Sequence, residues 1–131
     1  MMDIKDFLKK ENILAVVGAS PNTEKWGFKV YNTLKRLGFD VYPVNPKHEK
    51  IRGNVCYPDL KSLPKKPDVV ITVVPPKITE DVVKECRKIG IKKVWMQPGS
   101  ESQNAVDFCK ENGIDVIYNV CFVADGLKEK W

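Results

Sequence analysis

Three segments of this chain have apolar residues at helical spacing, end at a glycine, and lead within a few residues into a β-branched apolar run. The glycines are Gly38, Gly90 and Gly113, and the sequences that start at them are GFDVYPV, GIKKVWM and GIDVIYN. Glycine is the residue most often found just past a helix end. A strand, a helix and a second strand in this order form the repeating unit of a parallel sheet with crossover helices.

Five continuous apolar runs predict the strands of this sheet. Apolar residues fill every position of such runs rather than every second one, which indicates strands buried on both faces by helices. The predicted fold is α/β, a single-domain Rossmann-like doubly wound sheet of about five mainly parallel strands flanked by helices. At 131 residues the chain has the size of one domain, spanning 1–131. The runs are Ile13–Gly18, Val41–Val44, Val69–Val74, Val94–Met96 and Val116–Val120.

The helical segments are expected between these runs, with acidic or hydroxyl residues at their starts. The second of them is expected to open at Thr79-Glu80-Asp81. The stretch Lys47–Pro67 is broken by glycine and proline and predicts a loop with one helical turn around Asp59–Leu63. Short amphipathic helices are expected at Asp3–Lys10 and Phe122–Lys130.

Composition excludes several classes of partner. Lys and Arg total 22 against 17 acids, a net charge of +5, but the lysines are scattered beside acids rather than gathered in a stripe. This predicts no nucleic-acid partner, while leaving a phosphate-bearing ligand possible. No apolar run reaches the roughly 18–20 residues of a membrane span, and the first residues have no signal-peptide pattern. We therefore expect a cytoplasmic protein with no membrane partner.

The cysteines predict no metal site. Cys56, Cys86, Cys109 and Cys121 form no C-x-x-C pair, and His48 is the one histidine. Zinc sites need closely spaced thiolate and imidazole ligands. Cys86 and Cys109 fall on the apolar faces of expected helices, where they would pack as small hydrophobic residues.

Ligands of open α/β sheets bind beyond the carboxyl ends of the strands, so the loops after each strand are the candidate site. The first such loop starts at Gly18-Ala19-Ser20 and enters a helix, where backbone N–H groups, Ser20 and Lys25 could hold a phosphate. It matches neither G-x-G-x-x-G nor the Walker A motif.

The loop after the second strand reads Val44-Asn45-Pro46-Lys47, where an NAD-binding unit has an acid. Asn45 and Lys47 suit a ribose that carries a 2′- or 3′-phosphate. A polar turn with a solvated lysine is the alternative.

Four motifs follow predicted strands in register: VGAS at 17–20, VNPK at 44–47, VVPP at 73–76 and VWMQPG at 94–99. Together they resemble the small CoA-binding domain proteins related to the N-terminal domain of the succinyl-CoA synthetase α subunit. The resemblance extends from Ile13 to Cys121. It implies coenzyme A as the ligand. The synthetase's phosphorylated histidine belongs to a second domain that this chain lacks, so synthetase activity is not implied.

The resemblance also implies a role for each motif. Gly18, Ala19 and Ser20 would bind the diphosphate, and Asn45, Pro46 and Lys47 the adenosine end with its phosphate. Val74, Pro75 and Pro76 would pack on adenine or pantetheine. The pantetheine arm would be bordered by Met96, Gln97, Pro98 and Gly99.

Cys121 follows the last predicted strand at the same edge. It could form a mixed disulfide with the CoA thiol, or it could be a buried thiol beside the last helix. Trp26, Trp95 and Trp131 are interpreted as packing residues, with shielding of a ligand as the alternative for Trp26.

The sequence contains no recognisable nucleophile–base pair, carboxylate dyad or metal cluster. We therefore predict non-catalytic binding of CoA or an acyl-CoA. The alternatives are a small NADP-dependent oxidoreductase and a regulatory subunit of an acyl-CoA ligase. The partner could be a ligase chain or a second copy of this chain.

Overall fold

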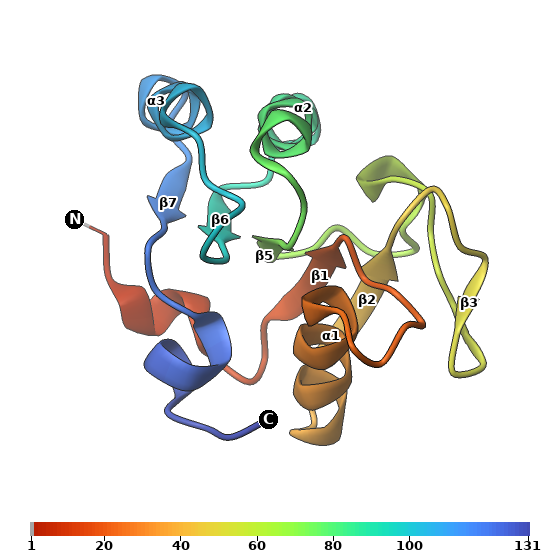
Figure 1. Cartoon of the computed structure of the whole chain (residues 1–131). Coiled ribbons are helices and arrows are strands. Elements are labelled where there is room, and N and C mark those ends of the chain that lie inside the picture. The colour runs from red at the N-terminus through yellow and green to blue at the C-terminus, as the bar shows by residue number, and fades with distance from the viewer. Residues whose placement is uncertain (1) are drawn as a thin grey trace.

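The computed structural model describes residues 2–131 and contains the predicted parallel sheet (Figure 1). Its five strands lie in the order β2-β1-β5-β6-β7, and every neighbouring pair is parallel. The expected α/β fold is confirmed. The strands are β1 (Ile13–Val17), β2 (Asp40–Val44), β5 (Val69–Thr72), β6 (Lys93–Met96) and β7 (Asp115–Ile117), and the helices are α1 (Trp26–Arg36), α2 (Pro76–Ile89) and α3 (Gln103–Glu111).

Both faces of the sheet are covered, which explains the continuous apolar runs. Along β1, Leu14 and Val16 pack with α1 on one face, while Ala15 and Val17 pack with α2 and α3 on the other. Figure 1 shows α2 and α3 above the sheet, and α1 with the two terminal segments below it. A strand with both sets of side chains in a core needs no polar alternation.

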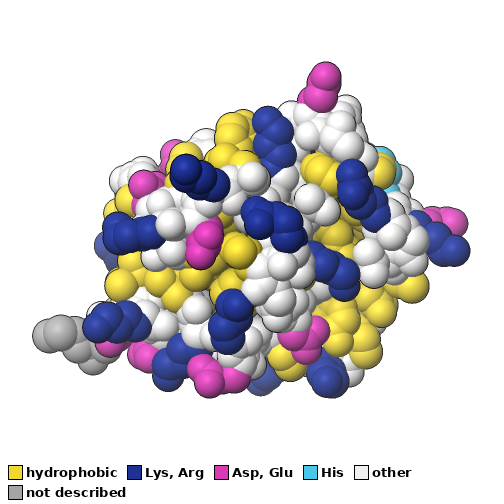
Figure 2. Space-filling model, turned by 90° about the horizontal axis from the view of Figure 1, so that it is seen from below, with side chains coloured by type: hydrophobic (Ala, Val, Ile, Leu, Met, Phe, Trp, Pro, Cys, Tyr) yellow, Lys and Arg dark blue, Asp and Glu magenta, His cyan; other side chains and the backbone are white. Residues whose placement is uncertain are grey.

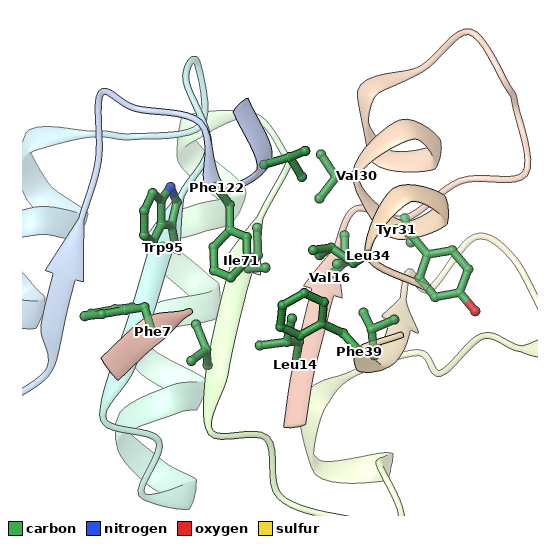
Figure 3. Packing of buried hydrophobic residues seen from close by; sticks show 14 of the residues in the cluster. Phe7, Leu14, Val16, Val30, Tyr31, Leu34, Phe39, Ile71, Trp95 and Phe122 are labelled. Atoms are coloured by element: carbon green, nitrogen blue, oxygen red, sulfur yellow. The ribbon is translucent and has the colours of Figure 1, made fainter. Parts of the chain in front are cut away.

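The N- and C-terminal segments cover the lower face beside α1. They contribute a 3-10 helix at Ile4–Phe7 and a π-helical segment at Phe122–Leu127. The fully buried Trp95 packs edge-on against Phe7 and Phe122, at centroid distances of 5.9 and 4.9 Å (Figure 3). Its indole N–H donates to the Val120 carbonyl at 2.8 Å. The packing role predicted for Trp95 is confirmed.

The stretch Lys47–Pro67 is more ordered than the expected loop. It contains a small antiparallel hairpin, β3 (Lys50–Ile51) and β4 (Asn54–Val55). The turn residues Arg52 and Gly53 both have positive φ, 50° and 80°, as in the two-residue turns that suit hairpin twist. The helical turn predicted around Asp59–Leu63 is confirmed as a 3-10 turn at Leu60–Ser62.

Several boundaries differ from the expectation. The helix expected at Asp3–Lys10 is the single turn Ile4–Phe7, and that expected at Phe122–Lys130 ends at Leu127. The third and fifth strands end at Thr72 and Ile117, before the end of each apolar run. The second helix begins at Pro76 rather than Thr79, because proline's fixed φ suits the first helical position.

Charges on the lower face are mixed. Figure 2 shows basic and acidic side chains interspersed with apolar ones, without a single basic stripe. Among residues 2–131, no helix has the length and hydropathy that crossing a membrane requires.

Candidate functional site

The order of the strands reverses direction between β1 and β5. The chain runs outward from β1 to β2 and then returns to the other side of β1 at β5. The loop after β1 enters α1 on one face, while the loop after β5 enters α2 on the other, which leaves a crevice between them. A groove of about 1160 Å³ lies at this point. It extends past the ends of β2, β1, β5 and β6 to the segment that follows β7.

Most of the residues singled out in the sequence are brought together here. Three are not part of the groove wall: Ala19 and Met96 are fully buried, and Pro76 is the first residue of α2. The candidate residues that line the groove are Gly18, Ser20, Lys25, Asn45, Pro46, Lys47, Val74, Pro75, Gln97, Pro98, Gly99 and Cys121.

Two glycines allow the elements around the groove to approach closely. Gly18 has a φ of +101°, and a Cβ on it would lie 2.2 Å from the Val73 carbonyl oxygen. A Cβ on Gly27 would lie 1.9 Å from the Gly18 carbonyl oxygen. Both positions therefore need glycine, and together they hold the start of α1 against the β1 loop.

The N-termini of α1 and α2 have no side-chain cap, whereas the Ser102 hydroxyl caps α3 by accepting from the Ala105 N–H at 3.0 Å. Backbone N–H groups in the first turn of a helix have no partner within the helix. With the helix dipole they attract an anion. The α1 terminus, with Lys25 as its N-cap residue, lies in the groove wall.

Asn45 ties the loop after β2 to the loop after β1. Its side-chain amide donates to the Ala19 carbonyl at 2.9 Å, and its side-chain oxygen accepts from the Lys47 backbone N–H at 2.9 Å. These bonds fix the turn from which the exposed Lys47 side chain extends. Within the described part of the chain, the groove is lined by Lys25, Lys47 and His48 and by no Asp or Glu side chain. An anion is therefore favoured at this end.

Gln97 organises the opposite end of the groove. Its side chain is nearly buried, accepts from the Phe122 N–H at 2.7 Å and donates to the Cys121 sulfur at 3.3 Å. The same sulfur accepts from the Ala124 N–H at 3.4 Å. Gln97 thus joins the end of β6 to the C-terminal segment.

Cys121 is the partly exposed cysteine among four. Burial raises the pKa of the Cys109 thiol to about 12 and that of Cys86 further, and burial also raises the pKa of Cys56. Cys86 and Cys109 pack in the core as predicted. Cys121 borders the groove and is partly exposed, so it differs in burial from the buried thiol given as its alternative, although it lies beside the last helix as that alternative says.

The Ser100 hydroxyl holds the loop after β6 in place. It donates to carbonyl oxygens of Thr72 and Gln97, at 3.0 and 2.7 Å, and lies 2.8 Å from the Thr72 hydroxyl. Gly99 next to it has a φ of +94° and open space around it. The loop therefore leaves β6 at a sharp turn and exposes Pro98 and Gly99 to the groove.

Several residues that line the groove were not predicted from the sequence. His48 follows Lys47 directly, and Ile78 is in the first turn of α2. Trp26 and Trp131 also line the groove and are 55% and 44% exposed, so the interpretation of these two as packing residues is wrong. The alternative given for Trp26, that it shields a ligand, is consistent with its position in the groove wall. The remaining lining residues are Val17, Gly27, Val73, Ser100 and Ala124.

Residues 12–126 match the family model described as a CoA binding domain. The chain belongs to this CoA-binding family. The family relationship inferred from the four motifs is therefore confirmed. The succinyl-CoA synthetase-like relatives include the ADP-forming acetate–CoA ligase II of Archaeoglobus fulgidus, which is 40% identical over 126 residues, 87% of this chain and 19% of the ligase.

Solved structures of similar chains have the same fold. A hypothetical protein from Pyrococcus horikoshii superposes with a TM-score of 0.85 at 39% identity, covering 91% of this chain and 84% of that one. The dinucleotide-forming acetyl-coenzyme A synthetase 1 of Ca. Korarchaeum cryptofilum superposes with a TM-score of 0.72 at 28% identity, covering 87% and 27%. The chain spans about a fifth of the length of the curated ligases it matches.

Proposed function

We propose that this chain binds coenzyme A or an acyl-CoA in the groove and catalyses no reaction there by itself. The observation that carries the proposal is the distribution of charge along the groove. Lys25, Lys47 and the uncapped start of α1 lie at the end near β1 and β2, while the end near Gln97 has no charged lining residue among those described. CoA has the same asymmetry, because its phosphates are all on the adenosine half and its pantetheine arm is uncharged.

The size of the groove suits an elongated cofactor. Neighbouring strands are about 4.8 Å apart, so the ends of β2 and β6 are separated by roughly 14 Å. Pockets for drug-sized ligands are roughly 300–1,000 Å³, and the groove volume of about 1160 Å³ is larger. The groove therefore has room for an elongated ligand such as CoA.

Each part of CoA has candidate partners in the groove. Gly18, Ser20 and Lys25 with the α1 terminus would hold the diphosphate. Asn45, Pro46 and Lys47 would hold the phosphorylated adenosine, and Val74 and Pro75 would pack on adenine or pantetheine. Gln97, Pro98 and Gly99 would border the arm.

The remaining three predicted residues would act only indirectly. The Ala19 carbonyl accepts from the Asn45 amide, Pro76 starts α2, and Met96 packs beneath the end of β6.

The spacing of the titratable side chains supports binding rather than catalysis. His48 follows β2, whereas the Cys121 thiol accepts a hydrogen bond from Gln97, which follows β6. In the sheet, β6 is three strand positions away from β2. A thiol and its general base need to lie within hydrogen-bonding distance, about 3 Å. This arrangement favours no nucleophilic reaction.

Calorimetric titration of the reduced protein with CoA, 3′-dephospho-CoA and NADP tests the proposal. We expect CoA to bind, and to bind more tightly than 3′-dephospho-CoA. Lys47→Ala should remove that difference, while Lys84→Ala, an exposed lysine on α2 outside the groove, should keep it. Binding of NADP without binding of CoA would refute the proposal in favour of the oxidoreductase alternative.

The ligase relatives support a second candidate, a CoA-binding subunit that completes a separate ligase chain. Mixing this chain with an ADP-forming acyl-CoA ligase that lacks its own CoA-binding domain tests this role. Restored thioester formation would support it. Failure to associate, measured by size-exclusion chromatography, would favour a stand-alone binder, and the same experiment reports whether the chain dimerises.

A further inference from the structure

Two exposed tryptophans line the groove. The large exposed apolar residues of the described chain are Met2, Ile4, Trp26, Val55, Ile78 and Trp131. Trp26 and Trp131 are the aromatic ones among them, and both line the groove. Exposed apolar surface in a groove marks a place that a ligand or partner covers. The flat indole rings suit a flat ligand group, because aromatic rings attract one another when they stack.

Contacts with α1 hold both tryptophans in place. Their rings meet edge-on at a centroid distance of 5.1 Å, and the Lys29 ammonium lies 4.6 Å from the centre of the Trp26 ring. The Lys130 carbonyl accepts from the Arg36 guanidinium at 3.0 Å, so the last residues lie beside α1 (Figure 1). The two rings are therefore positioned before a ligand binds, which reduces the entropy that binding costs.

The basic residues place these rings at the adenosine half of the proposed ligand. Trp26 directly follows Lys25, the N-cap residue of α1, where the diphosphate would bind. Lys47, which follows β2, would hold the 3′-phosphate. Both phosphate groups of CoA are attached to the same ribose, so this ribose lies between the two lysines. The adenine attached to it is therefore close to the start of α1, where Trp26 lies.

Adenine is the one flat aromatic group of CoA. The phosphates are charged, the ribose is polar, and the pantetheine arm extends from the diphosphate towards Gln97 at the uncharged end. Stacking of a base on an aromatic side chain needs no hydrogen bond to the base, so exposed ring surface is sufficient for it. Val74 and Pro75 follow β5, which lies between β1 and β6, and are thus left to contact the pantetheine arm.

We infer that Trp26 and Trp131 form an adenine platform, a pair of indole rings on which the base of the ligand stacks. The inference rests on the proposed function and adds that the last residue of the chain contacts the ligand. The ligand class is then an adenine nucleotide that carries phosphates at both the 3′ and the 5′ position of its ribose.

Calorimetric titrations with CoA and with adenosine 3′,5′-bisphosphate, which has the adenosine half of CoA but no pantetheine, test the platform. Removing an aromatic ring that stacks on a base weakens binding roughly 5- to 150-fold, so Trp131→Ala should lower both affinities by a similar factor in this range. Trp131→Phe should retain most of the affinity. Trp131→Leu should lose most of it, because leucine fills space without a ring. The same substitutions of Trp26 should follow the same order.

Tryptophan fluorescence distinguishes stacking from an indirect effect on α1. Adenine that stacks on an indole quenches its emission, so bound CoA and bound adenosine 3′,5′-bisphosphate should both quench the unmodified protein. In the double variant Trp26→Phe/Trp131→Phe the ligands should still bind but quench nothing, because the remaining Trp95 is fully buried. The emission of Trp95 also reports whether this variant is folded. The matched control is Ile4→Ala, which removes an exposed apolar side chain outside the groove and should change neither affinity nor quenching.

Four results would overturn the inference. Native CoA affinity in the alanine variants, or bound CoA that quenches no emission, would place the base elsewhere and leave the proposed function intact. A loss of affinity for CoA but not for adenosine 3′,5′-bisphosphate would mean that the rings contact the pantetheine arm. Native affinity in both leucine variants would mean that the side chains only fill space. No binding of CoA by the unmodified protein would refute the proposed function as well.

Discussion

Replacing Gly27 by alanine should separate the start of α1 from the groove. The added Cβ would lie 1.9 Å from the Gly18 carbonyl oxygen, whereas real Cβ atoms essentially never come within 3.0 Å of a neighbour. Because that neighbour is backbone, the start of α1 has to retreat by about 1 Å, the difference between 3.0 and 1.9 Å.

The effect on binding should exceed the effect on stability. Overpacking costs about 1–3 kcal/mol, and the better helix propensity of alanine offsets up to ~1 kcal/mol of it. The expected loss of unfolding free energy is therefore about 1–2 kcal/mol. A retreat of 1 Å stretches an N–H···O bond beyond its useful range. One hydrogen bond to a charged phosphate contributes about 1.5–3 kcal/mol, so CoA should bind roughly 10- to 150-fold more weakly.

The assay combines urea unfolding with calorimetric titration of CoA. The control is Gly113→Ala, where φ is +71° and no atom lies within 4 Å of the added Cβ. That change costs only the left-handed backbone strain, about 1–2 kcal/mol, and should leave CoA affinity unchanged. Native affinity in a folded Gly27→Ala protein would refute the claim that the α1 terminus contacts the ligand.

Three further measurements follow from the buried thiols and the indole. Burial raises the pKa of Cys109 from 9.0 to about 12 and that of Cys86 further, so the folded chain keeps protons that the unfolded chain releases. The unfolding free energy should thus fall between about pH 9 and 12 by up to ~1.4 kcal/mol per pH unit for each thiol. If Cys109→Ala left the slope of unfolding free energy against pH unchanged, this expectation would be contradicted. Iodoacetamide at pH 8 should modify Cys121 before Cys86, and acetyl-CoA, which has no free thiol to consume the reagent, should slow the modification of Cys121. Peptide mass spectrometry showing Cys86 modified first would be evidence against the described burial. Trp95→Phe removes the donor to the Val120 carbonyl and should lower the unfolding free energy by about 1–3 kcal/mol, whereas an unchanged urea midpoint would show that this bond adds no stability.

The sheet could be predicted because strands that are buried on both faces have unbroken runs of apolar residues. Gly38, Gly90 and Gly113 then mark the helix ends with positive φ. The hairpin was missed because its turn uses Arg52-Gly53, and arginine is not among the residues typical of a first turn position with positive φ.

The groove could be predicted in part. A sequence motif is a contiguous run of residues, whereas successive side chains of a strand point to opposite faces. The motif at the end of β6 therefore contains both Met96, which is buried in the core, and Gln97, which lines the groove. Trp26 and Trp131 could not be distinguished from core aromatics, because their contact joins residues 105 positions apart, 131 − 26, which no local pattern records.

The most direct test of the account is an amide NMR titration of the reduced protein with CoA. The account predicts shift changes at the strand ends, at Gly18, Asn45 and Gln97, and in the first turn of α1. Gly38 and Gly113, which precede β2 and β7 at the other edge of the sheet, should be unaffected. Changes confined to that other edge, or no changes at saturating CoA, would contradict the claim that this groove is a CoA site.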